Sequence, residues 1–480
     1  MTDLAFRSAT HLAAMVRKRK IGCVELLDHF LARIERLDGQ INAVVARDFD
    51  AARRRARTLD RMKDPIGKLH GVPVTVKESF DVAGLPTTWG IPARRDIAAT
   101  SDALAVQRLR QAGAVLMGKT NVPLMLADWQ SFNEIYGTTN NPWDLARAPG
   151  GSSGGAAAAL AAGLTGLECG SDIGGSIRQP AHACGVFGHK PSWGLLPLYG
   201  HSPMPQSAGE VDIACIGPLA RTAGDLALAL DLLAGPDPLD STMQPKLAKG
   251  PKSPKGLRVA IWAEDPATRT DPEITAAVLA AGAVLEKAGA VVSAADRPAV
   301  DQDAAFRVYL RLLGAVTLAR LPPDEAARMA AQLAALPPDD RSADAEVLRS
   351  LGITHAAWTG LHEQRNHMRR AWGAFFQEWD VLICPAFAVP AQPHQQGTPP
   401  HEMFTTIDGA RQPWGELLFW PGVIGAMRLP ATAAPIGFSS AGLPIGCQIV
   451  GPMHADCTTI AVAGMLEDLL GGFRKPKGWA

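Results

Sequence analysis

Two glycine- and serine-rich segments constrain this chain more than any other feature. They are residues 150–155 (GGSSGG) and 170–180 (GSDIGGSIRQP), and an alanine-rich stretch that predicts a helix separates them. A single loop of this kind usually caps a helix, but two copies in a core-forming region weaken that explanation. Glycine clusters let backbone N–H groups approach a ligand, and a serine closing such a loop can present its hydroxyl beside an oxyanion hole. The pair therefore indicates a site built from backbone and serine.

A lysine upstream of the two loops is the candidate base. Lys77 ends the apolar run 72–76 (VPVTV), so we expect its ammonium group to be buried. Desolvation lowers a lysine pKa from about 10.4, which allows the side chain to act as a base near neutrality. Taken alone, a lysine that extends to solvent from a strand end would be the favoured interpretation.

Three other patterns resemble known motifs and fail on physical grounds. Residues 113–120 (GAVLMGKT) satisfy a phosphate-loop pattern, but AVLM suits a buried strand rather than an open loop. Residues 362–367 (HEQRNH) space two histidines five apart, which places them about 140° apart around a helix and prevents joint metal binding. A nucleophile elbow at Ser152 needs a preceding strand, whereas NPWDLARAP is polar. The elbow would also require a histidine downstream, and no local sequence pattern supports that role for His182, His189 or His201.

The charge balance excludes several classes of partner. Lysine plus arginine and aspartate plus glutamate both number 47, so nothing favours binding to nucleic acid or an anionic membrane. The seven cysteines form no CxxC pair, which argues against a disulfide framework or a structural zinc site. We expect these thiols to fill the core, including Cys169 and Cys184 near the second loop. With no visible signal peptide, a cytoplasmic location fits best.

Strand and helix patterns alternate along the chain, which predicts a layered α/β fold with a largely parallel or mixed sheet. Residues 1–60 read as a helical N-terminal layer, and residues 234–256 are the best linker candidate. Strand patterns resume beyond it, so the sheet is expected to continue across the linker. Residues 301–375 read as an alanine-rich helical insert.

Three separated motifs together resemble the amidase-signature family of serine hydrolases. They are Lys77 in GVPVTVKESFDVAGLPTT, the GGSSGG loop, and GSDIGGSIRQPA. Lys77 precedes Ser152 by 75 residues and Ser176 follows it by 24, spacings similar to the family pattern. The resemblance also covers GKTNVP, NNPWD and GLPIGCQIVGP, and is weakest between about 240 and 375. It implies one large domain over 1–480, with its core at about 24–466 and a mixed, mostly parallel twisted sheet covered by helices on both faces.

The resemblance also implies roles for individual residues. Ser176 would be the nucleophile, Ser152 a bridging serine preceded by a cis peptide bond, and Lys77 the base. The expected oxyanion hole consists of the backbone N–H groups of Ile173, Gly174, Gly175 and Ser176. Three side chains would support the loops: Ser153, Asp172 and Arg178. Three residues would line the acyl pocket: Leu126, Ala127 and Trp129. No metal or cofactor is implied.

The expected activity is hydrolysis of a small or aryl carboxylic acid amide to acid and amine through a seryl acyl-enzyme. Two enzymatic alternatives remain: the glutaminase subunit of a tRNA-dependent amidotransferase, and a carbamate or ester hydrolase of the same family. Against the glutaminase, no aspartate lies near Trp420 of the kind that would hold the glutamine ammonium. A non-catalytic binding protein of this fold is the third alternative, although both serines and the lysine are present. The expected partner is a small amide, and a homodimer is compatible with the sequence.

Overall fold

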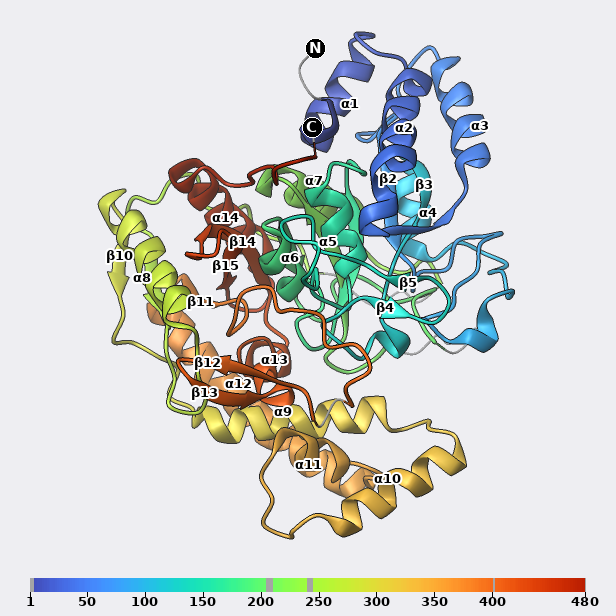
Figure 1. The fold of residues 1–480 in the computed structure, drawn as a ribbon. Helices are drawn as coiled ribbons and strands as arrows, with labels where there is room; N and C mark the ends of the chain where they lie inside the picture. The colour runs from blue at the N-terminus through green and yellow to red at the C-terminus, as the bar shows by residue number, and fades with distance from the viewer. Residues whose placement is uncertain (1–3, 204–209, 240–244, 400–401, 480) are drawn as a thin grey trace.

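The computed structural model describes residues 4–203, 210–239, 245–399 and 402–479 (Figure 1). Its main sheet has eight strands in the order β10-β9-β11-β15-β14-β7-β8-β6. These strands span Val291–Ser293 (β10), Arg258–Ile261 (β9), Val381–Pro385 (β11), Pro444–Val450 (β15), Ala431–Phe438 (β14), Phe187–Lys190 (β7), Cys215–Ala220 (β8) and Glu168–Asp172 (β6). Because β9 follows residues 234–256, the sheet continues across the predicted linker.

The strands of this sheet run in mixed directions. β9 pairs in parallel with β10 and β11, whereas every other neighbouring pair is antiparallel. A short turn at residues 439–443 joins β14 to β15, and such a connection can only produce an antiparallel pair. The predicted mixed α/β class is confirmed, but parallel pairing is confined to one end of the sheet rather than predominating as expected.

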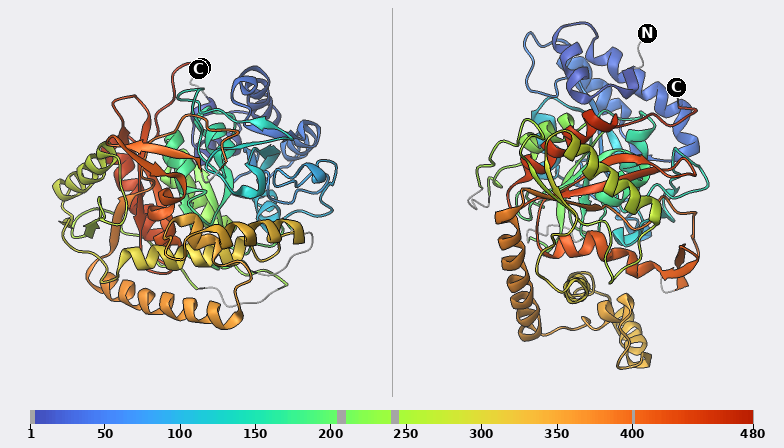
Figure 2. Two further views of the ribbon diagram at one scale, coloured as in Figure 1. Left: turned by 60° about the horizontal axis from the view of Figure 1, so that its bottom comes forward. Right: turned by 90° about the vertical axis from the view of Figure 1, so that its left-hand side faces the viewer.

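Helices cover the sheet so completely that every residue of β6, β8, β11 and β15 is buried. This pattern requires cover on both faces. One set of helices packs together along the sheet: α7 (Ala223–Leu233), α8 (Pro272–Lys287) and α14 (Asp456–Leu470). A second set, α5 (Gly154–Ala161) and α6 (Arg178–Cys184), packs where the two glycine-rich loops end (Figure 2). Asp271 accepts a bond from the N–H of Glu273 and so caps α8.

The N-terminal layer adds a second, three-stranded sheet in the order β1-β3-β2. It comprises α1 (Ala9–Arg17), α2 (Cys23–Ile41), β1 (Val44–Arg47), α3 (Phe49–Asp60), β2 (Pro73–Lys77), α4 (Leu104–Gln111) and β3 (Val115–Thr120). All six residues of β3 are buried, so the phosphate-loop pattern at 113–120 belongs to a core strand as predicted. Lys77 is the last residue of β2, which positions its side chain beside the main sheet.

A helical segment follows the main-sheet strand β10. It contains α9 (Gln302–Thr317), α10 (Pro323–Ala335), α11 (Ala343–Leu348) and α12 (His355–Glu378). The remaining strands are β4 (Phe132–Asn133), β5 (Gly137–Thr138), β12 (Phe404–Ile407) and β13 (Ala410–Pro413), and the remaining α-helix is α13 (Phe419–Ala426). Within the predicted linker, residues 240–244 lie outside the described residues, and the described part of 235–257 contains neither helix nor strand.

Two hydrophobic cores meet at the glycine-rich loops. The larger core joins the N-terminal helices to the main sheet, and the smaller one, rich in tryptophan and phenylalanine, lies among α9, α12 and α13. The glycine-rich loops are therefore held between two packed bodies of side chains.

None of the described helices combines the length and apolar character that crossing a bilayer requires.

Candidate active site

Lys77 is buried and bonded only to neutral groups. Its side chain has no solvent exposure. The Nζ atom donates to Ser152 Oγ at 2.7 Å, to Ser171 Oγ at 2.9 Å and to the Ser171 carbonyl at 3.4 Å. Lys77 and Ser152 come from different elements, 75 positions apart in the chain, and meet because β2 runs beside β6.

Burial changes the protonation of this lysine. Desolvation lowers the pKa of Lys77 to about 7, although the charges of Asp172 and Glu168 oppose that change. The side chain is therefore available as a neutral amine near pH 7, hydrogen-bonded to a serine hydroxyl. This arrangement can accept a proton from Ser152.

The first glycine-rich loop is fixed by its neighbours. The Gly151–Ser152 peptide bond is cis. Gln179 Oε1 accepts the N–H of Gly151 at 2.9 Å, and the Ser131 hydroxyl both donates to the Gly150 carbonyl and accepts the N–H of Gly154. A Cβ atom on Gly151 would lie 2.4 Å from the Asp128 carbonyl oxygen, so only glycine fits.

The second loop carries Ser176 beside a buried ion pair. Asp172 and Arg178 are both fully buried, with Arg178 Nη2 2.8 Å from Asp172 Oδ1. Arg178 also donates to Gln448 Oε1 and to the Pro421 carbonyl, which ties the loop to β15 and α13. Burial alone would raise the pKa of Asp172, but the charge and hydrogen bonds of Arg178 hold it at about 2. The carboxylate is thus ionised at neutral pH.

The peptide planes before Ser176 are oriented from both sides. The Tyr309 hydroxyl of α9 donates to the Ile173 carbonyl at 3.2 Å, and Trp129 Nε1 donates to the Gly174 carbonyl at 3.1 Å. The N–H of Gly175 donates to Asp172 Oδ1 at 2.9 Å. The Gly175 N–H, one of the four predicted oxyanion donors, is therefore bound to Asp172. The other three predicted donors, the N–H groups of Ile173, Gly174 and Ser176, do not bond to this carboxylate.

Gly175 needs its glycine for two reasons. Its φ is +94°, and a Cβ atom would lie 2.8 Å from Pro421 Cβ. The left-handed backbone and the close approach of α13 together exclude a larger residue. The sharp turn that presents Ser176 therefore depends on this position.

The other predicted residues differ in how closely they approach the loops. Ser153 Oγ donates to the Ser171 carbonyl, and its N–H donates to the Ser176 carbonyl, so it links the two loops. Of the three predicted pocket residues, Trp129 is buried against the second loop, whereas Leu126 is half-buried and Ala127 is exposed. Trp129 also packs against the rings of Phe387 and Trp414.

Sequence reasoning assigned no role to Ser171, Gln179 or Tyr309. Ser171 lies directly before Asp172 in the second motif, so its position was a usable signal. Gln179 lies within the same motif but acts on the first loop, which only the folded chain reveals. Tyr309 comes from the helical segment where the family resemblance is weakest, and no local pattern distinguishes it from a core aromatic residue.

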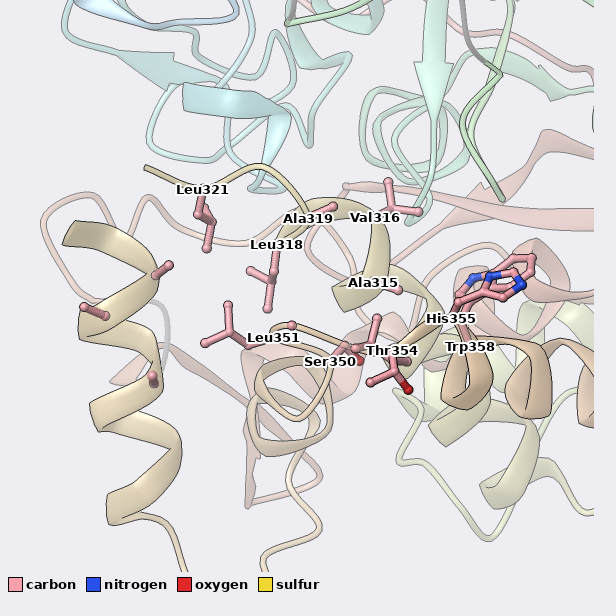
Figure 3. A pocket seen from close by; sticks show the side chains of 15 residues that line it. Ala315, Val316, Leu318, Ala319, Leu321, Ser350, Leu351, Thr354, His355 and Trp358 are labelled. Carbon is pink, nitrogen blue, oxygen red and sulfur yellow. The ribbon is translucent and has the colours of Figure 1, made fainter. Parts of the chain in front are cut away.

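A large apolar cavity lies elsewhere, among the ends of α9, α10 and α12 (Figure 3). Its volume is about 790 Å³, and none of the predicted site residues lines it. Cys169 and Cys184 are fully buried, as expected for core thiols, and burial raises their pKa. Within the described ranges, no three His, Cys, Asp or Glu side chains are grouped so that they could hold a metal ion.

Comparison with known proteins decides the family. Residues 25–460 match the model of the family described as Amidase. The chain belongs to the amidase family. It is an enzyme acting on amide C–N bonds, as the resemblance in its motifs implied.

Three relatives of this amidase cover nearly all of it. It is 32% identical to an indoleacetamide hydrolase of Bradyrhizobium diazoefficiens, over 97% of this chain and 86% of the relative. It is 34% identical to an acylamidase of Rhodococcus erythropolis, over 97% and 96% of the two chains. It is also 34% identical to a subunit of the glutamyl-tRNA(Gln) amidotransferase of Synechococcus sp., over 92% of each.

A solved structure with a similar fold is that of 6-aminohexanoate cyclic dimer hydrolase. The TM-score is 0.79 at 30% sequence identity, and the match covers 99% of each chain. The likeness spans the main sheet, the N-terminal layer and the helical segment alike.

Proposed function

We propose that this amidase hydrolyses the amide of a small or aryl carboxylic acid through an acyl-enzyme on Ser176. The observation that carries the proposal is the 2.7 Å hydrogen bond from Lys77 Nζ to Ser152 Oγ in a buried site. A neutral Lys77 takes a proton through Ser152 as Ser176 attacks the amide carbon, and the same route returns it to the departing amine. Water then hydrolyses the acyl-enzyme.

The oxyanion of the tetrahedral intermediate would be bound by backbone N–H groups of the second loop. One such donor contributes about 3 kcal/mol to lowering a barrier. Tyr309 supports this role because it holds the Ile173 carbonyl oxygen, and the same peptide unit carries the Gly174 N–H. This donor is thereby oriented before the substrate binds.

The surroundings of the loop favour an uncharged, apolar acyl group. Trp129 packs with Phe387 and Trp414, and Leu418 lies close to Gly174. Aromatic and aliphatic walls suit an aryl or short alkyl group. The names of the indoleacetamide hydrolase and acylamidase relatives agree with this substrate class.

A panel of hydrolysis assays tests the proposal. Purified protein is offered amides, anilides, carbamates and esters with aliphatic and aromatic acyl groups, beside Ser176→Ala as the inactive control. We expect turnover of amides or anilides that Ser176→Ala abolishes. Turnover of carbamates or esters alone would change the bond class, and turnover that survives in Ser176→Ala would refute the mechanism.

The similarity to an amidotransferase component supports a second candidate, a glutaminase acting within a complex. Trp420, in the region that would have to supply the glutamine-binding acid, is buried and donates instead to Thr270 Oγ1. Glutaminase activity that appears only with a co-purifying partner would favour this candidate over the free-standing amidase.

A further inference from the structure

Three oxygen atoms surround the Nζ atom of Lys77, and two of them belong to Ser171. Ser171 Oγ lies 2.9 Å from Nζ and the Ser171 carbonyl oxygen lies 3.4 Å from it, while Ser152 Oγ lies at 2.7 Å. Ser171 is the fourth residue of β6, and only 6% of it is exposed. The proposed mechanism uses Ser152 and leaves Ser171 without a role.

The hydrogens on Nζ explain why two further acceptors are needed. A protonated lysine has three N–H donors, which the three oxygen atoms can accept together. The neutral amine has two N–H groups and one lone pair. If Lys77 is to take a proton from Ser152, its lone pair must face Ser152 Oγ, so both N–H groups need acceptors elsewhere. Among the described residues, the two oxygen atoms of Ser171 are the acceptors that remain.

The backbone of Ser171 is itself held in place. Ser153 Oγ donates to the Ser171 carbonyl at 3.3 Å and accepts the N–H of Ser171 at 3.4 Å. Ser171 is also paired with Ile216 of the antiparallel strand β8. Because Ser153 directly follows Ser152 in the chain, Lys77 and the three serines form a closed ring of bonded groups. The oxygen atoms of Ser171 are therefore fixed relative to Nζ before a substrate binds.

We propose that Ser171 is a positioning residue that binds both hydrogens of the neutral Lys77 amine and so directs its lone pair to Ser152. The inference rests on the proposed function, which makes Lys77 the base. Ser171 transfers no proton, because its two oxygen atoms accept from Nζ in both protonation states. When the proton moves, only the bond between Nζ and Ser152 Oγ exchanges donor and acceptor.

The titratable groups near Lys77 remain in place when Ser171 is replaced. Strand β6 carries three of them and the segment after β7 carries a fourth: Glu168, Cys169, Asp172 and His201. On the neighbouring strand β3, Lys119 Nζ lies 3.9 Å from Glu78. The helices packed against β2 are α2 and α5, and no described side chain of either changes the pKa of Lys77. A changed pH profile in a Ser171 variant would therefore report the contact with Nζ.

The test measures the rate at which a fluorophosphonate labels the intact protein between pH 5 and 9, and needs no natural substrate. In Ser171→Ala, one N–H of the amine loses its acceptor, so the plateau rate should fall about three- to tenfold. The acidic limb should move to lower pH by about half to one unit, because the ammonium loses a stronger hydrogen bond than the neutral amine does.

Two further variants separate this role from simple packing. Ser171→Thr keeps the hydroxyl and should restore the acidic limb and most of the plateau rate. Ser171→Cys replaces the hydroxyl with a weak acceptor of similar shape, so it should change the profile in the same direction as Ser171→Ala and takes its place if that variant does not fold. Ser350→Ala is the matched control, since it removes a buried hydroxyl that donates to the Arg311 carbonyl, and it should leave the profile unchanged.

Several outcomes would overturn the role of Ser171. They are an acidic limb that stays in place in folded Ser171→Ala, a plateau rate that is unchanged or higher, and a Ser171→Thr profile that matches Ser171→Ala. A higher plateau would mean that the Ser171 hydroxyl donates to the lone pair and competes with Ser152. Absence of Ser176-dependent labelling in the unaltered protein would instead refute the proposed function, and this inference with it.

Discussion

At the scale of single residues, the proposed function depends on a lysine whose burial favours its neutral form. Desolvation lowers the pKa of Lys77 to about 7, and three bonds to serine atoms hold its Nζ in place. The apolar run before Lys77 predicts burial of this side chain only in combination with the two glycine- and serine-rich loops, because the run alone favours a lysine that extends to solvent. The sequence could not supply the second serine partner, Ser171, since that contact depends on how β2 and β6 lie together.

The state of Lys77 predicts the pH dependence of hydrolysis. In the proposed mechanism the neutral amine is the active form, so kcat/KM should be low below pH 6, rise through about pH 7 and level off above it. Lys77→Ala should lose about 100- to 10,000-fold at neutral pH, the usual contribution of a general base. The activity of Lys77→Ala on activated esters should partly recover as pH rises, because hydroxide replaces the missing base. A Lys77→Ala profile parallel to that of the unaltered enzyme would exclude Lys77 as base.

The hydrogen bond from Tyr309 to the Ile173 carbonyl leads to a second prediction at this scale. Tyr309→Phe removes the hydroxyl that holds the Ile173 carbonyl while it preserves the ring. One neutral hydrogen bond contributes about 1 kcal/mol, which corresponds to roughly a fivefold fall in kcat. KM should stay unchanged, since oxyanion donors act on the transition state. The exposed Tyr199→Phe is the matched control, and an effect on KM alone would assign Tyr309 to substrate binding instead.

At the scale of elements, the second glycine-rich loop is anchored by one buried ion pair. Asp172 ends β6, Arg178 begins α6, and Arg178 also bonds to β15 and to α13. The closeness of Asp172 and Arg178 in the sequence was enough to predict that they support the loop together. The bonds to Gln448 and Pro421 were beyond sequence reasoning because they join segments more than 240 residues apart.

Asp172→Asn should destabilise the fold strongly. Removing one partner of a buried ion pair leaves an uncompensated charge and costs about 3–5 kcal/mol. Asp231→Asn is the control, because its ion pair with Lys68 is largely exposed and contributes little. Chemical denaturation at pH 7 compares the two variants, and equal midpoints would contradict this assignment.

The same carboxylate has a defined pH window. Its pKa is depressed in the folded state, from an ordinary value of 3.8 to about 2. The stabilisation is therefore fully present above about pH 4 and is lost as pH falls toward 2. The stability difference between the unaltered protein and Asp172→Asn should narrow over that interval.

At the scale of the whole molecule, the α/β class and the strand and helix succession could be predicted from patterning, whereas strand direction could not. The β14–β15 turn and the insertion of β8 between β7 and β6 produce antiparallel pairs that no local pattern reveals. The contact of Tyr309 with the second loop could not be predicted either, because α9 reaches the site only through tertiary packing.

Thiol reactivity tests the packing of the whole chain. Six of the seven cysteines are buried, and Cys457 is partly exposed. A thiol reagent should therefore modify at most one thiol rapidly in the native protein and all seven after denaturation. Rapid modification of several native thiols would contradict the packing described.

The central claim is that Ser176 is the nucleophile. Its most direct test is peptide mass spectrometry of the protein after reaction with a fluorophosphonate. We predict one covalent adduct, located on Ser176, that forms slowly in Lys77→Ala and is absent in Ser176→Ala. An adduct located on Ser152, or one that persists in Ser176→Ala, would contradict the claim.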